Sequence, residues 1–107
     1  MDEQARSRLR GPIGRRVISN RREILRMIRT AGASNPRLFG SVARGEETET
    51  SDLDIAVDFP VRELGLIPLA HLADEISQVL EVHVDVVAST AVTAAVESAI
   101  NAESVAL

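Results

Sequence analysis

From Leu38 to Val57 the sequence reads LFGSVARGEETETSDLDIAV, and this stretch decides the fold. From Asp52 onward, polar and apolar residues alternate, which is the pattern of a strand with one buried face. Leu53 and Ile55 lie on the apolar face of this strand, and Asp52 and Asp54 lie on the opposite face. Because residues two apart on a strand point the same way, the two carboxylates should project side by side.

Two adjacent carboxylates repel each other unless a cation lies between them. Mg²⁺ characteristically takes one or two protein carboxylates and fills its remaining positions with water and phosphate oxygens. The spacing of Asp52 and Asp54 therefore indicates a Mg²⁺ site. An isolated pair of this kind is more often two acids on the solvated face of a strand, so the surrounding residues must decide between the two interpretations.

Gly40 and Ser41 separate a short apolar run from the helix-compatible segment that ends at Arg44. A glycine between a strand and a helix lets the backbone approach a phosphate, to which helix N–H groups and a serine hydroxyl can donate. An ordinary tight turn capped by Ser41 explains the same residues. Arg44 could reach back to the phosphates or across to an acid in the next loop. The chain contains no lysine, so it has no P-loop.

A third acid, Asp85, lies in a run where valines alternate with polar residues. This pattern predicts a strand that places Asp85 and His83 on one face, and pairing beside the Asp54 strand would bring Asp85 to the other two acids. A carboxylate flanked by valines is costly in a core, so it is expected only where a neighbouring group or ion compensates its charge. The alternative is an acid on the solvated face of an edge strand. We interpret His83 as a neighbour of the site rather than a ligand.

The other segments predict helices around these strands. A helix begins near Asn20, which can form a capping box with Glu23, and Gly32 ends it. Apolar residues at helical spacing predict a second long helix over 67–80, and a closing helix over 93–105. The order is helix, strand, short helix, strand, helix, strand, helix, which indicates an α+β fold with a small mixed sheet packed by helices.

The N-terminal residues 1–16 contain arginines, two glycines and a proline without a steady apolar period. We therefore expect a mobile or loosely packed leader over 1–16 and a single domain over 17–107. Ten of the twelve arginines lie within residues 1–37, whereas the rest of the chain carries thirteen of the sixteen acids. A basic arm on an acidic body could bind nucleic acid or an acidic partner, steer a triphosphate, or simply be solvated.

Composition excludes several classes of protein. With two Phe and no Tyr or Trp, the chain lacks the stacking platforms of a single-strand nucleic-acid binder, and we expect no direct nucleic-acid binding. The absence of cysteine excludes disulfides and thiolate metal sites. No apolar run approaches the length of a membrane span, and the first residues do not resemble a secretory signal, so we expect a cytoplasmic protein.

Together these residues resemble a known family. Gly40-Ser41, ten intervening residues, Asp52-Leu53-Asp54 and the later strand around Asp85 are similar to the minimal nucleotidyltransferases of the DNA polymerase beta superfamily. The resemblance runs from about residue 20 to the C-terminus and implies the polymerase beta-like nucleotidyltransferase fold. It implies that Gly40 and Ser41 bind the triphosphate of ATP, with Arg44 beside them, and that the three aspartates are catalytic and ligate Mg²⁺.

Stand-alone members of this size resemble the antitoxins of toxin–antitoxin modules whose toxin is a HEPN-domain ribonuclease. The implied activity is transfer of AMP from ATP to a tyrosine of that toxin, within a hetero-oligomer. Since this chain has no tyrosine, a tyrosine acceptor must belong to another protein. Two alternatives remain: an antitoxin that neutralises its partner by binding, with weak or no catalysis, and a nucleotidyltransferase of small molecules. The second alternative usually requires a further domain.

Overall fold

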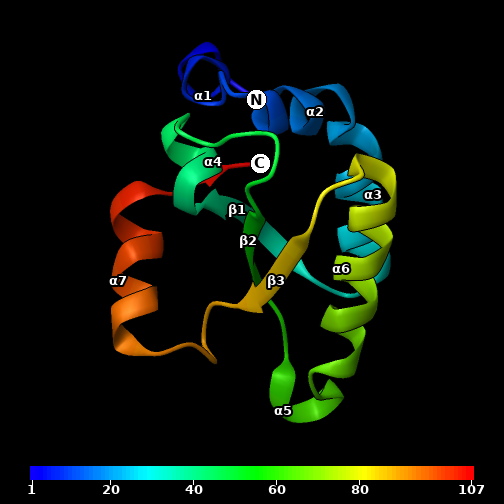
Figure 1. The fold of residues 1–107 in the computed structure, drawn as a ribbon. Helices are drawn as coiled ribbons and strands as arrows, with labels where there is room; N and C mark the ends of the chain where they lie inside the picture. Colours follow the sequence, from blue (N-terminus) through cyan, green and yellow to red (C-terminus); the bar gives the residue numbers. More distant parts are fainter.

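The computed structural model describes all 107 residues and has the expected α+β architecture, a four-stranded mixed sheet packed by helices (Figure 1). The helices are α1 (Glu3–Arg8), α2 (Pro12–Ser19), α3 (Arg21–Thr30), α4 (Gly40–Arg44), α5 (Val61–Leu64), α6 (Ile67–Leu80) and α7 (Ala94–Glu103). The strands are β1 (Ser34–Phe39), β2 (Leu53–Asp58), β3 (Val84–Ala88) and β4 (Val105–Ala106). None of the helices is long and apolar enough to cross a membrane.

The sheet has the strand order β3-β2-β1-β4. The central strand β2 runs antiparallel to β1 and parallel to β3, with α6 as the crossover between the parallel pair. The alternation predicted for β2 is confirmed, because Leu53, Ile55 and Val57 are fully buried. The predicted pairing of the Asp85 strand beside the Asp54 strand is also confirmed.

Helices cover both faces of this sheet. Figure 1 shows α3 and α6 on one side of the strands and α4 and α7 on the other. The apolar stripe of α6 supplies Leu72 and Ile76, which are fully buried, as is Leu38 of β1. The core is therefore aliphatic, as the composition requires, and the polar ends of β2 and β3 remain open at one edge of the domain.

The N-terminal leader differs from the expectation of a mobile or loosely packed segment. Residues 3–8 and 12–19 form α1 and α2, and Leu9, Ile13 and Val17 are buried within the main core. These three residues are spaced by four, so they lie on one side of the chain and direct the arginines outward. Gly11-Pro12 breaks the pattern in the sequence, but it only starts α2, with proline in the first turn.

Two predicted helix ends need correction. Asn20 does not cap α3 through its side chain; it ends α2, and its amide donates to the carbonyl of Arg16 at 2.8 Å. The closing helix begins after Thr93 as predicted, but it ends at Glu103. Val105 then pairs with β1 as part of β4, so strand pairing with the sheet replaces the last helical turn. The end of α3 before Gly32, whose φ is +86°, is confirmed.

Candidate active site

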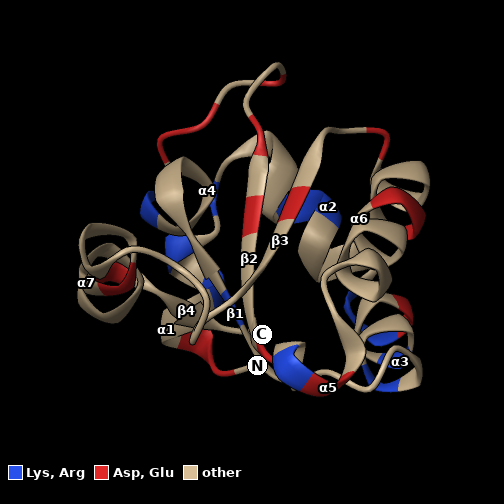
Figure 2. Cartoon of the chain, turned by 90° about the horizontal axis from the view of Figure 1, so that it is seen from below, with Lys and Arg blue, Asp and Glu red and all other residues tan.

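The three aspartates come together at the open end of two parallel strands. Asp54 of β2 and Asp85 of β3 are direct register partners, and Asp52 immediately precedes β2. Figure 2 shows the acidic segments of β2 and β3 side by side, below the acidic loop that joins α4 to β2. The β2 and β3 backbones thus hold two carboxylates on neighbouring strands at the same level of the sheet.

Asp54 is the least solvated carboxylate of the three. Partial burial, followed by the negative charges of Asp85 and Asp52, raises its pKa from 3.8 to about 6, while His83 acts in the opposite direction. Such a shift means that the folded protein disfavours a third negative charge at this place. A bound divalent cation would remove that penalty, so this group of acids fits a metal ion such as Mg²⁺.

The ligand atoms of Asp52, His83 and Asp85 all lie within 4.8 Å of one another. The ring nitrogen Nε2 of His83 is 3.3 Å from Oδ1 of Asp85, and both side chains are more than half exposed. His83 therefore lies beside the acids, which agrees with its interpretation as a neighbour of the site. The signal was its position two residues before Asp85, which places both side chains on one face. Mg²⁺ prefers oxygen ligands, so His83 suits a hydrogen-bonding role beside the metal.

Gly40 lies directly against Asp54. Phe39, the residue before it, is the register partner of Asp54, and the φ of Gly40 is +75°. A Cβ atom at this position would lie 2.5 Å from Oδ2 of Asp54, so only glycine allows this close approach. The hydroxyl of Ser41 forms no hydrogen bond with another group of the chain, and the first N–H groups of a helix such as α4 have no hydrogen-bond partner within the helix. The hydroxyl and these N–H groups are candidate donors to an anion beside Asp54.

Arg44 has a different environment. Its Nε donates to Glu46 at 2.7 Å, and its Nη1 donates to both carboxylate oxygens of Glu103 at 3.0 Å. These two carboxylates raise the pKa of Arg44 above its ordinary value. The sequence left two orientations open for the Arg44 side chain, one toward the phosphates and one toward an acid of the following loop. In this structure the side chain points to the loop acid Glu46. A role for Arg44 in phosphate binding remains a prediction and requires the guanidinium to leave this pair.

The acidic loop between α4 and β2 contains one buried member. Glu47 is only 7% exposed, and its Oε2 accepts a hydrogen bond of 2.8 Å from the N–H of Gly14 in the first turn of α2. A carboxylate at this place also interacts favourably with the positive end of the helix dipole. The acids of the loop are thus not all directed at the site, because Glu47 fixes α2 instead.

Comparison with known proteins points to one family. The sequence model of the nucleotidyltransferase domain family matches residues 22–105. A relative from Methanocaldococcus jannaschii, named "putative protein adenylyltransferase", is 40% identical over 55 residues, which cover 51% of this chain and 55% of the relative. The matched part is therefore little more than half of the relative's own length.

Two solved structures share the fold. One is described as a minimal nucleotidyltransferase; it has a TM-score of 0.72 and 34% identity, over 85% of this chain and 92% of the other. The second is a toxin–antitoxin with AMP-PNP, which has a TM-score of 0.69 and 22% identity over 81% of this chain and 71% of the other. At that identity the second likeness concerns the fold alone.

Proposed function

Because this chain belongs to the nucleotidyltransferase domain family, we propose that it transfers a nucleotide from a nucleoside triphosphate to a hydroxyl group of an acceptor. The proposal depends on one observation above all: Asp54 and Asp85 are register partners, with Gly40 packed against the Asp54 carboxylate. The proposal is supported because candidate anion donors and three carboxylates share one small open site.

The chemistry follows from the positions of these groups. Gly40 and Ser41 bind the triphosphate through backbone N–H groups and the serine hydroxyl, and Asp52 and Asp54 ligate Mg²⁺. The metal, when bound, neutralises charge on the phosphates and supplies the electrophilic assistance of two-metal phosphoryl transfer. Asp54 must be ionised to act as a ligand, and because its pKa in the metal-free protein is raised to about 6, Mg²⁺ would compete with a proton for this carboxylate.

Asp85 lies on the side of the site that faces away from Gly40, because β3 is the strand beyond β2. We propose that it accepts the proton of the acceptor hydroxyl or holds a second cation there. The acceptor oxygen then forms a bond to the α-phosphorus as the bond to the leaving phosphate oxygen breaks. Pyrophosphate leaves, and the product is a nucleotide ester of the acceptor.

We further propose that the nucleotide is ATP, that the group transferred is AMP, and that the acceptor is a tyrosine of a HEPN-domain toxin in the cytoplasm. Support comes from the name of the adenylyltransferase relative and from the fold shared with a toxin–antitoxin that contains AMP-PNP. The chain has no tyrosine of its own, which agrees with an acceptor on a partner protein. Together the two proteins would form a hetero-oligomer.

The test uses this protein, the protein encoded by the adjacent gene, labelled ATP and Mg²⁺. Wild type should label the partner, and Asp52→Asn/Asp54→Asn should reduce labelling by at least about 10²-fold. Glu63→Gln/Glu97→Gln is the matched control, because it also removes two negative charges, from residues that form no hydrogen bond or ion pair through their side chains. Full neutralisation of the partner by the double aspartate variant, without label in either case, would instead support neutralisation by binding alone.

A further inference from the structure

We propose that the acceptor protein docks as an extended segment along the open edge of β3, in the apolar groove between β3 and α6, and that this docking delivers its hydroxyl to Asp85. The inference rests on the proposed function, because it names the surface that would receive the acceptor of the transfer. Apart from Asp85, which the groove shares with the candidate active site, it assigns a binding role to residues that take no part in holding the nucleotide or the metal.

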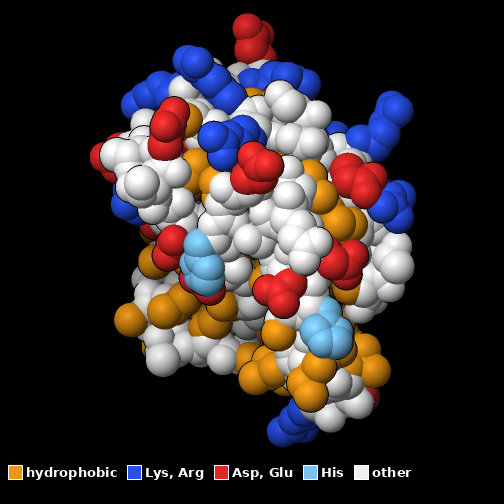
Figure 3. All heavy atoms as spheres, turned by 45° about the vertical axis from the view of Figure 1, so that its right-hand side comes forward, with side chains coloured by type: hydrophobic (Ala, Val, Ile, Leu, Met, Phe, Trp, Pro, Cys, Tyr) orange, Lys and Arg blue, Asp and Glu red, His pale blue; other side chains and the backbone are white.

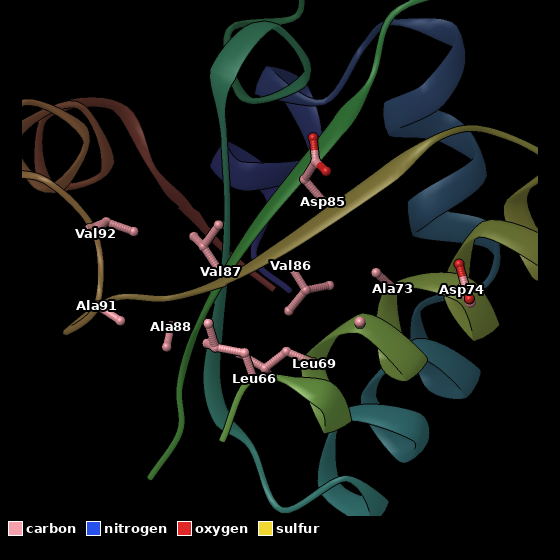
Figure 4. Close-up of a pocket in the computed structure, with 11 residues that line it drawn as sticks. Leu66, Leu69, Ala73, Asp74, Asp85, Val86, Val87, Ala88, Ala91 and Val92 are labelled. Carbon is pink, nitrogen blue, oxygen red and sulfur yellow. The ribbon is translucent and has the colours of Figure 1, made fainter. Parts of the chain in front are cut away.

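The groove has a volume of about 460 Å³. Nine of its eleven lining residues are hydrophobic, and the remaining two are Asp74 and Asp85. Figure 4 shows Val86 directed toward α6, where Leu66 and Leu69 face it, whereas the side chain of Asp85, the residue before it, projects from the opposite side of the strand. A concave apolar surface of this size that ends in a carboxylate is typical of a binding site.

The backbone of β3 is unpaired on the groove side. β3 is the last strand of the sheet, and only β2 pairs with it. The carbonyl of His83 accepts a hydrogen bond from the N–H of Leu53 in β2, and the N–H of Ser89 donates to the carbonyl of Val57 in β2. Every second residue from His83 to Ser89 therefore points its backbone groups toward β2. By the same alternation, the N–H and C=O groups of Val84, Val86 and Ala88 point outward, where an added strand can bond them.

Apart from the charge of Asp85, this edge lacks several of the usual protections against strand addition. It contains no proline, lysine or bulge, and its pairing with β2 is regular over five residues. Leu66 in the groove is 59% exposed, and the apolar surface continues past the groove to Ile67, which is 71% exposed. Figure 3 shows hydrophobic side chains gathered near both histidines on this face, with most of the arginines toward the opposite end. An exposed apolar surface of this kind is expected to have a partner.

Charge indicates which partner fits. The lining contains two carboxylates and no cationic side chain, so a segment with a basic residue among its apolar residues is complementary. A second copy of this chain fits less well, because pairing two β3 edges would bring two acidic sites toward each other. We therefore assign the groove to a different protein, whose docked segment is apolar at alternate positions and carries a basic residue.

The groove and the candidate active site share Asp85. Residues of a strand advance about 3.3 Å each, so a segment paired with Val86 has its next residues beside Asp85. A hydroxyl-bearing residue at that position reaches the carboxylate without any movement of the domain. Docking on β3 thus determines which hydroxyl of the acceptor reacts.

The test compares two arginine substitutions on α6. Ala70→Arg adds bulk and a positive charge inside the groove, whereas Gln78→Arg adds the same side chain at an exposed position of the same helix outside it. With the adjacent-gene protein as acceptor, Ala70→Arg should raise the KM for the acceptor about tenfold and leave the KM for ATP unchanged. Gln78→Arg should change neither. Equal acceptor KM values for Ala70→Arg and wild type would overturn the docking site.

A second measurement separates this inference from the proposed function. Hydrogen exchange of β3 is followed with and without the adjacent-gene protein, in the absence of ATP. Protection of the amides of Val84, Val86 and Ala88 supports docking even if no nucleotide is transferred. Transfer without such protection overturns docking and leaves the proposed function intact. Concentration-dependent protection by the chain alone, with a dimer by light scattering, overturns it in favour of a second copy.

Discussion

Asp54 and Asp85 occupy matching positions on two adjacent parallel strands, so their carboxylates lie beside each other without any loop to separate them. Gly40 packs against the first and the apolar groove ends at the second. In the proposed function, the pair therefore separates the side that binds the phosphates from the side that receives the acceptor. Each of the following predictions concerns one of the groups that maintain this arrangement.

Replacing Asp54 with asparagine should stabilise the protein while removing its activity. The substitution relieves repulsion from Asp85 and Asp52, which together with partial burial raises the pKa of Asp54 to about 6. Because the Asp54 side chain is only partly buried, solvent screening reduces the energy that this pKa shift implies. We therefore expect the free energy of unfolding to rise by about 1 kcal/mol at pH 8 in EDTA. Urea denaturation measures this change. Added Mg²⁺ should raise the melting temperature of wild type more than that of the variant, and an equal rise in both would contradict the assigned ligand.

The same gain in stability should depend on pH in a defined direction. The pKa of Asp54 is raised in the folded state, so the folded protein binds the extra proton between pH 3.8 and about 6. The stabilisation that this proton provides is fully present below pH 3.8 and is lost as the pH rises through about 6. The difference in unfolding free energy between Asp54→Asn and wild type should therefore be near zero at pH 3.5 and complete above pH 7. A difference that is independent of pH would show that ionisation of Asp54 is not its cause.

Local patterns were sufficient to predict the strand that bears Asp52 and Asp54 and the helix over 67–80, because each shows a steady period of its own. The alternating valines predicted a strand around Asp85, but the place of Asp85 beside Asp54 depended on a pairing between distant segments that the valines alone do not specify. The sequence also predicted that His83 lies on the same face as Asp85, because residues two apart on a strand point the same way. Its distance to Asp85 depends on side-chain orientation, which no sequence pattern specifies.

The failures have a common cause in contacts between distant residues. The N-terminal segment packs because its apolar residues enter the core of the distant sheet, and Glu47, 33 residues beyond Gly14, bonds its backbone N–H. The strand at Val105 exists because Leu38 offers it an unpaired edge. Neither partner lies near the segment that it stabilises, so a local period cannot reveal the contact.

Replacing Gly40 with alanine should damage the site more than the fold. Both Gly40 and Gly32 have positive φ angles, +75° and +86°, so alanine at either place is strained by about 1–3 kcal/mol. A Cβ at Gly32 meets nothing within 4 Å, whereas one at Gly40 meets the Asp54 carboxylate. Gly40→Ala should therefore lower the transfer rate on the order of 10²-fold, and Gly32→Ala should not. Denaturation and transfer assays on both variants separate the effects; equal transfer rates would refute the close approach.

Replacing Glu47 with alanine should loosen the N-terminal helices without touching the metal site. The Glu47 carboxylate is buried, and its loss leaves the N–H of Gly14 without a partner, which destabilises the protein by about 1–3 kcal/mol. Glu47→Gln retains an acceptor oxygen and should lose less. Glu49→Ala, an exposed substitution in the same loop, should stay within about 0.5 kcal/mol of wild type. Hydrogen exchange should show faster exchange over residues 12–19 in Glu47→Ala only. If Glu47→Ala matches Glu49→Ala in both measurements, α2 is held by its apolar face alone, through Ile13 and Val17.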